Sequence, residues 1–288
     1  MGILVNKDTR VIVQGITGRL GSAQTKMMLE YGTKIVAGVT PGRGGETIFG
    51  IPVYDSVEEA LREHEADASV LYVPAPSLKE AAFEAMEAGI KFMVIITDWV
   101  PVHDALEIKA FASRLGARYI GPNTPGITVP GEIKLGMIHT VTPGNIAVIS
   151  RSGTLTGEVT NLLTTSGLGQ SVVLGLGGDP VVGLRLKEVL ELLERDEHTE
   201  AIVIIGEIGG TMEEEAADYI RRHVSKPVAA FIAGITAPPE KRMGHAGAII
   251  TGGRGTAESK ISALKSAGVK IAKTPWDLPT LLKDMLRR

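Results

Sequence analysis

A histidine and a glutamate give the strongest chemical signal in this sequence. His245 lies in the segment MGHAGAII (243–250), close to Gly244 and Gly247 and just before a short apolar run. Small neighbours let the backbone approach another group closely, or let a loop move. An imidazole in such a loop can bind a metal, accept a proton or attack as a nucleophile, and it can also be an ordinary core residue.

Glu207 is the candidate partner of this imidazole. It ends a strongly apolar segment, IVIIGEIGG (202–210). Strands that follow one another in the sequence commonly neighbour in the sheet, so we expect Glu207 and His245 to meet. A carboxylate that accepts the proton of one ring nitrogen fixes the tautomer and raises the basicity of the other nitrogen. The pair therefore predicts a nucleophile or a general base, with helix capping as the alternative role for Glu207.

A first glycine loop predicts an anion site. The segment GITGRLGS (15–22) follows an apolar run and opens a helical pattern, and backbone N–H groups at a helix start bind phosphate. Its spacing is G-x-x-G-x-x-G, not the dinucleotide pattern G-x-G-x-x-G. After the next run, GVTPGRGG (38–45) offers Arg43 where an NAD site needs an acid. An arginine there suits a phosphate on a ribose, as in NADP or coenzyme A, and a plain tight turn is the alternative.

A second glycine loop repeats the device in VISRSGTLTGEV (148–159). Ser152, Gly153 and Thr154 precede a helical pattern, where hydroxyl and N–H groups would hold a phosphate or a carboxylate. An ordinary N-cap is the alternative. Ser152 as a hydrolase nucleophile is disfavoured, because SRSGT is not the G-x-S-x-G elbow.

The elements that must position these residues form two α/β domains. Short apolar runs alternate with helical patterns, which predicts parallel, doubly wound sheets buried on both faces. Ligands of such sheets bind beyond the carboxyl ends of the strands. Turn residues in GMIHTVTPGN (136–145) predict a boundary that gives domains 1–142 and 143–288, the second flavodoxin-like. The predicted strands are 11–16, 34–39, 68–75, 91–97 and 118–122, then 145–150, 172–176, 201–208, 227–234, 247–250 and 269–272.

Composition excludes several classes of function. The 288 residues carry a net charge of −3, which offers nothing to attract nucleic acid or an anionic membrane. Cysteine is absent, which rules out disulfides, thiolate catalysis and cysteine metal sites. Without an H-x-x-x-H pattern we expect no metal site. No run is long enough to span a membrane or to serve as an export signal, so a cytoplasmic location is expected.

Several motifs together resemble the α subunit of the succinyl-CoA synthetase family, that is, of succinate–CoA ligases that form a nucleoside diphosphate. The matching segments run in order along essentially the whole chain, 1–288: GITG with GVTPGRGG, GPNTPG, SRSGTLT, GEIGG, and KRMGHAGAII followed by GGRGTAESK. The resemblance implies a Rossmann-like CoA-binding domain followed by a flavodoxin-like ligase domain.

The resemblance also implies roles for individual residues. His245 would be phosphorylated during turnover, and Glu207 would support its ring. Ser152, Gly153 and Thr154 would cradle the phosphate, and Gly157 would stand at the position near the acid substrate. The residues implied for coenzyme A are Thr17, Gly18, Arg19, Leu20, Arg43, Ile96, Thr97 and Asp98.

The implied reaction belongs to the tricarboxylic acid cycle: succinyl-CoA and phosphate give succinyl phosphate and CoA, His245 takes the phosphoryl group, and a nucleoside diphosphate receives it. No G-x-x-x-x-G-K-[ST] motif is present in the sequence. The resemblance places ATP or GTP and Mg²⁺ on a separate β subunit with an ATP-grasp fold, so the chain is expected to need that partner.

Some positions depart from the family pattern and keep alternatives open. Gly157 stands where the family has a tyrosine, which leaves malate or another small carboxylate as an alternative to succinate. Arg43 replaces a lysine, TDWVP (97–101) replaces a Thr-Glu-Gly sequence, and Ala23 with Gln24 replaces a Phe-His pair. The alternatives from other classes are an NADPH-dependent reductase, a CoA-sensing module without catalysis, and a hydrolase that uses Ser152, His245 and an acid.

Overall fold

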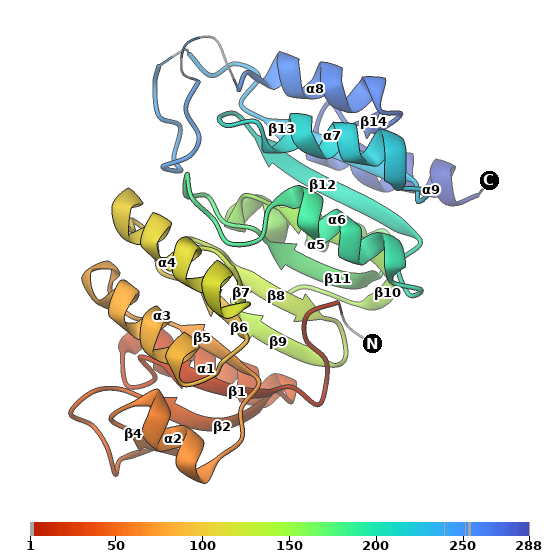
Figure 1. Ribbon diagram of the computed structural model, residues 1–288. Coiled ribbons are helices and arrows are strands. Elements are labelled where there is room, and N and C mark those ends of the chain that lie inside the picture. Colours follow the sequence, from red (N-terminus) through yellow and green to blue (C-terminus); the bar gives the residue numbers. More distant parts are fainter. Residues whose placement is uncertain (1–2, 239, 251, 253–254, 288) are drawn as a thin grey trace.

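The computed structural model describes residues 3–238, 240–250, 252 and 255–287, which form two parallel-dominated sheets side by side (Figure 1). In the first sheet the strand order is β3-β4-β2-β1-β5-β6-β7. Apart from the short β3–β4 pair, all neighbours are parallel, and β4-β2-β1-β5-β6-β7 is the Rossmann order 3-2-1-4-5-6. The strands are β1 (Arg10–Gln14), β2 (Lys34–Val39), β3 (Thr47–Ile48), β4 (Ile51–Tyr54), β5 (Ala68–Leu71), β6 (Phe92–Ile95) and β7 (Arg118–Ile120).

Helices cover the first sheet because each crossover between parallel strands must return across a face. In Figure 1, α2, α3 and α4 lie over one face, while α1 contacts β9 of the second sheet. The chain order reverses between β1 and β5, the kind of switch point at which open α/β sheets bind ligands. The helices are α1 (Arg19–Tyr31), α2 (Val57–Glu63), α3 (Leu78–Glu87) and α4 (Val102–Leu115), with a 3₁₀ turn η1 (Ala75–Ser77).

The second sheet has the strand order β14-β13-β12-β10-β11-β8-β9. Its parallel part, β11-β10-β12-β13-β14, is the flavodoxin-like order 2-1-3-4-5, with the switch point between β10 and β12. The strands are β8 (Gly126–Val129), β9 (Ile133–Gly136), β10 (Pro143–Ser150), β11 (Gln170–Gly175), β12 (Ala201–Glu207), β13 (Val228–Ala233) and β14 (Lys270–Ile271). The helices are α5 (Gly153–Thr165), α6 (Leu186–Arg195), α7 (Met212–His223), α8 (Ala257–Ser266) and α9 (Leu278–Leu286), with a 3₁₀ turn η2 (Pro275–Asp277).

The antiparallel hairpin β8–β9 was not predicted from the sequence. It pairs with β11 and so belongs to the second sheet, which means that the chain changes sheet between β7 and β8. The domain division at 142/143 remains a prediction; strand pairing alone would divide the chain earlier. One apolar core joins the two sheets, since Val11, Ile127 and Ile149 belong to the same buried cluster.

The structure confirms the alternating α/β pattern and corrects one strand. Residues 247–250, predicted as a strand, form a turn and an irregular segment in the structure. Gly247 N–H donates to Gly178 O at 3.0 Å and Met243 N–H to Ala248 O at 2.9 Å, so this backbone bonds to a loop and to itself rather than to the sheet. The motif GGRGTAESK (252–260) includes Gly253 and Arg254, which lie outside the described residues.

Candidate functional site

The structure brings His245 and Glu207 into direct contact at the carboxyl edge of the second sheet. Glu207 is the last residue of β12, and His245 lies in the loop between β13 and α8. The His245 Nδ1 atom is 2.8 Å from Glu207 Oε2, and the Glu207 side chain is 7% exposed against 26% for His245. With Nδ1 held by the carboxylate, Nε2 is the nitrogen that can attack a substrate.

Glu207 also sets the charge state of the imidazole. Its hydrogen bond is the main cause that raises the pKa of His245 above the ordinary histidine value, although burial and the Arg151 charge act in the opposite direction. A nucleophilic imidazole must be neutral, so a reaction in which Nε2 attacks should become faster as the pH rises through the pKa of His245.

For the phosphorylation of His245 that the sequence resemblance implies, Glu207→Gln is expected to move the pH midpoint to lower pH, because the carboxylate that raises the pKa is removed. The maximal rate should fall by about 10- to 100-fold, the value of a hydrogen bond to a charged group. Rapid-quench labelling with radioactive ATP across pH 5 to 9 measures both quantities. Glu215→Gln is the matched control, since Glu215 lies on α7 and pairs with Arg185. An unchanged midpoint in Glu207→Gln would contradict the assigned role.

Glycines surround His245 because other residues would not fit. A Cβ atom on Gly178 would lie 2.6 Å from Cγ of the His245 ring, and a Cβ atom on Gly209 would lie 2.0 Å from Gly247 O. Gly244 has a φ of 84°, in the left-handed region that favours glycine. Close packing and backbone conformation therefore explain these glycines in the position shown.

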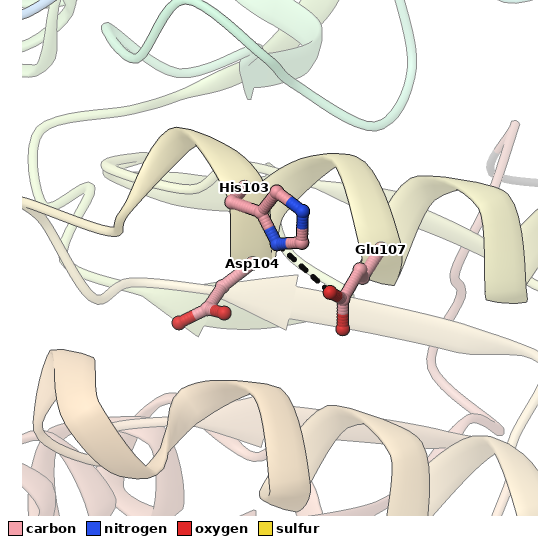
Figure 2. Close-up of side chains that lie close together, drawn as sticks. All are labelled: His103, Asp104 and Glu107. Atoms are coloured by element: carbon pink, nitrogen blue, oxygen red, sulfur yellow. Dashed lines mark ion pairs between the residues drawn. The ribbon is translucent and has the colours of Figure 1, made fainter.

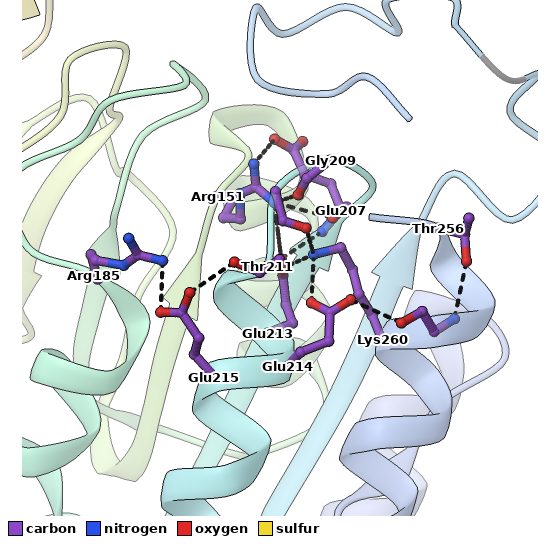
Figure 3. A network of polar contacts seen from close by, with 12 residues as sticks. Arg151, Arg185, Glu207, Gly209, Thr211, Glu213, Glu214, Glu215, Thr256 and Lys260 are labelled. Carbon is purple, nitrogen blue, oxygen red and sulfur yellow. Dashed lines mark hydrogen bonds and ion pairs between the residues drawn. The ribbon is translucent and has the colours of Figure 1, made fainter. Parts of the chain in front are cut away.

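A buried network of alternating charges lies behind Glu207 (Figure 3). Arg151 is 3.5 Å from Glu207 Oε1 and 3.1 Å from Glu213 Oε1, and it also donates to the carbonyl oxygens of Glu207 and Gly209. Lys260, fully buried on α8, forms an ion pair with Glu213 and contacts Glu214 at 3.1 Å. Burial opposes the ionisation of Glu213, but the charges of Arg151 and Lys260 outweigh it and lower its pKa.

This network was missed in the sequence. Arg151 stands inside the segment SRSGT, where only the hydroxyl and glycine residues attracted attention, and Lys260 looks like an exposed helix residue. The one available signal was position: Arg151 directly follows β10, beside β12 at the switch point.

The second glycine loop forms the start of α5 at the same switch point. Ser152 is the N-cap residue, and its side chain accepts a hydrogen bond from Leu155 N–H at 3.4 Å. The N–H groups of a first helical turn lack helical partners, so those of Gly153 and Thr154 are suited to an anion. Gly157, one turn further, is exposed, and a Cβ atom there would meet nothing within 4 Å among the described residues.

The residues expected to bind CoA lie at the carboxyl edge of the first sheet. Thr17 Oγ1 is 3.2 Å from Thr40 Oγ1, which links the loop before α1 to the loop that carries Arg43. The Arg43 side chain is exposed and forms an ion pair with Glu46. Gly18 is the N-cap residue of α1, and the exposed Arg19 and Leu20 follow it.

The other expected CoA segment, 96–98, follows β6. Ile96 and Thr97 are buried and Asp98 is exposed, and Thr97 Oγ1 donates to Val73 O at 2.7 Å. Strand β5 lies between β1 and β6, so the segment is two strands away from residues 17–20. An extended ligand across the edge would be needed to contact both.

Among the residues that the structure describes, one cluster of side chains has the residue types of a metal site. Figure 2 shows His103, Asp104 and Glu107 on α4, with His103 Nδ1 at 2.8 Å from Glu107 Oε1. Lys79 Nζ lies 3.1 Å from Asp104 and 3.2 Å from Glu107, so an ammonium group already neutralises the carboxylates. We interpret the cluster as an ion-paired helix surface, and the absence of a metal site remains a prediction. None of the helices in the described part of the chain is both long and apolar enough to cross a membrane.

Comparison with known proteins matches two family models to separate parts of the chain. The CoA binding domain family matches residues 6–99, and the CoA-ligase family matches residues 149–270. The succinate–CoA ligase [ADP-forming] subunit alpha 2 of Archaeoglobus fulgidus is 54% identical over 288 residues, which cover 99% of this chain and 100% of that protein. The corresponding alpha subunit of Methanothermobacter thermautotrophicus is 55% identical over 287 residues, 99% of this chain and 96% of that one.

Among solved structures, the ATP citrate lyase of Methanothrix soehngenii, in complex with citrate and coenzyme A, has the same fold. It aligns with a TM-score of 0.89 at 24% identity over 99% of this chain, which spans about half (51%) of that longer chain. At this identity the likeness shows the fold alone. The curated relatives, by contrast, match nearly end to end at more than half identity, and the chain therefore belongs to the family of succinate–CoA ligase alpha subunits.

Proposed function

We propose that this chain is the α subunit of an ADP-forming succinate–CoA ligase, which reversibly converts succinate, CoA and ATP to succinyl-CoA, ADP and phosphate. The observation that carries the proposal is the 2.8 Å contact between His245 Nδ1 and Glu207, which leaves Nε2 as the phosphoryl carrier. The two matched family domains and the names of the relatives support the same reaction.

In the direction of ATP synthesis the reaction has three steps. A phosphate oxygen attacks the thioester carbonyl of succinyl-CoA, the C–S bond breaks, and the CoA thiolate takes up a proton. Nε2 of neutral His245 then attacks the phosphorus of succinyl phosphate, the bond to the acyl oxygen breaks, and succinate leaves. Finally, a terminal oxygen of ADP takes the phosphoryl group from Nε2, which gives ATP and restores the imidazole.

We place the substrate sites at the carboxyl edges of the two sheets. The start of α5, with Ser152, Gly153 and Thr154, holds the phosphate by N–H and hydroxyl groups. The loop 17–20, Arg43 and the segment 96–98 hold CoA. A CoA phosphate would compete with Glu46 for the guanidinium of Arg43, an exchange that arginine makes readily because its fork binds carboxylate and phosphate alike.

The nucleotide site belongs to a partner. Family membership implies a β subunit, and we propose that this subunit has an ATP-grasp fold and binds ATP with Mg²⁺. The motif of a P-loop is absent from the sequence, which supports a site outside this chain. The loop around His245 then carries the phosphoryl group between the CoA edge and the partner.

Succinate is the acid favoured by the names of the relatives. The exposed Gly157 leaves open space beside the start of α5, and malate is the alternative to test. The reductase, the CoA-sensing module and the hydrolase are not supported, because the chain belongs to a ligase family along its whole length.

The test is reconstitution with the partner subunit and a panel of acids. We expect ADP formation that depends on both CoA and succinate, with malate turned over at least about tenfold more slowly, the discrimination that one added hydroxyl gives in a fitted site. The chain without its partner should bind CoA and form no ADP. Oxidation of NADPH, ADP formation without CoA, or a preference for another acid would contradict the corresponding part of the proposal.

A further inference from the structure

The loop between β11 and α6 connects the carboxyl edge of the first sheet, where CoA is expected, to the carboxyl edge of the second sheet, where His245 lies. Gly178 N–H donates to Asn123 O at 3.1 Å, and Gly178 O accepts from Gly247 N–H at 3.0 Å. Its Cα lies against the His245 ring, where a Cβ atom would come within 2.6 Å of Cγ. Gly178 therefore contacts Asn123 on one side and, on the other, the loop that carries His245 (243–250, the histidine loop).

Asp179, the next residue, is buried with 3% exposure and has no part in the reaction described above. Its Oδ1 atom is 3.4 Å from Asn123 Nδ2, which donates to it. Burial raises the pKa of Asp179 and the charge of Asp98 adds to the rise, while the hydrogen bond from Asn123 and the charge of His245 oppose it.

The contact with Asn123 connects Asp179 to the segment expected to bind CoA. Asn123 N–H donates to Thr97 O at 2.7 Å, and Val100 follows Asp98 after one residue. The residue between them, Trp99, has a φ of 57° and is 66% exposed. A left-handed conformation is uncommon outside glycine and persists where the neighbours hold it in place, as the hydrogen bond from Asn123 to Thr97 does here.

Several hydrogen bonds join the first sheet to the loop between β11 and α6, among them Gly121 N–H to Leu176 O at 2.9 Å and Leu184 N–H to Tyr119 O at 2.8 Å. A cavity of about 650 Å³ separates Leu106 and Lys109 of α4 from Ala246 and Gly247 of the histidine loop, and Asp179 lines it. Within this junction, Gly178 and Asp179 lead from Asn123 to the loop that carries His245.

We infer that Asp179 is a positioning residue, which holds the CoA segment 96–98 in register with the docked imidazole of His245. The inference rests on the proposed function. The contacts of Gly178 with Gly247 and with the His245 ring exist only while the histidine loop is docked, as in this structure. The positioning by Asp179 therefore acts on the step that involves CoA. It does not act on the step in which the partner's ATP phosphorylates His245.

The experiment separates these two half-reactions in the reconstituted complex. His245 is labelled with radioactive ATP, and the label is then discharged with succinate and CoA in a single turnover. Asp179→Ala should label within about twofold of wild type and discharge about 10- to 100-fold more slowly, the effect of a displacement near 1 Å. Asp179→Asn should stay within about threefold of wild type in both steps, because its side-chain oxygen can still accept the hydrogen bond from Asn123. CoA affinity should change by less than about threefold, since residues 17–20 and 43 are untouched.

A second variant tests the same contact from the other side. Asn123→Gly removes the amide and suits the φ of 59° at this position, and it should slow discharge selectively even if Asp179→Ala folds poorly. The inference is overturned by discharge at the wild-type rate in Asp179→Ala or Asn123→Gly, by equal losses in both half-reactions, or by an Asp179→Asn variant as slow as Asp179→Ala. Failure of ATP to label His245 in the wild-type complex would instead overturn the proposed function.

Discussion

His245→Asn is expected to abolish CoA-dependent ADP formation by the reconstituted complex, with a loss of at least about 10⁴-fold, because the nucleophile of the phosphoryl relay is removed. Asparagine keeps a polar side chain beside Glu207 and has no nitrogen that can carry the phosphoryl group. Initial rates and incorporation of label from radioactive ATP measure the loss.

The fold should be unaffected, since the imidazole is a quarter exposed on a loop and outside the buried clusters. Circular dichroism and CoA binding should therefore match those of the wild type. His198→Asn is the matched control, because His198 is exposed in the loop between α6 and β12. Label retained on the His245→Asn chain would refute the relay.

Lys260→Met should lower the free energy of unfolding by about 3 to 5 kcal/mol, the usual cost of removing one partner from a buried ion pair. Lys260 is fully buried, and its ammonium group contacts Glu213, Glu214 and Gly210 O. Without it, the fully buried carboxylate of Glu213 keeps the ion pair with Arg151 and the hydrogen bond from Glu207 N–H, and its charge is less well balanced. Chemical denaturation of the isolated chain measures the change.

Two companion variants test the electrostatic explanation. Lys265→Met removes an exposed lysine from the same helix and should change stability by less than about 0.5 kcal/mol. The double variant Lys260→Met/Glu213→Gln should recover part of the lost stability, because the uncompensated charge is also removed. Equal stability of Lys260→Met and wild type would show that the network contributes little to folding.

The sequence predicted the parts of the site that local patterns report. Glu207 ends a fully buried strand and His245 follows the next one, so parallel pairing of β12 with β13 was enough to expect their contact. The structure brings these side chains together, while their roles in turnover remain proposals. The Rossmann and flavodoxin-like strand orders agree with the predicted alternation of strands and helices.

Other features depend on contacts between distant segments and have no local signal. Lys260 lies 47 residues after Glu213, and its burial follows from the packing of α8 on α7. Asp179 faces Asn123, 56 residues earlier, across the junction of the two sheets. The strand predicted at 247–250 was wrong because an apolar run next to glycines does not reveal that Gly247 must bond to the loop at Gly178.

The most direct test of the account is to identify the phosphorylated atom. The wild-type complex would be incubated with ATP, and the phosphorylated chain, with ¹⁵N-labelled histidine, would be analysed by NMR through the nitrogen–phosphorus coupling. Because Glu207 holds Nδ1 at 2.8 Å, the account predicts phosphate on Nε2 of His245 alone. Phosphate on Nδ1, on Ser152 or on any other residue would contradict it.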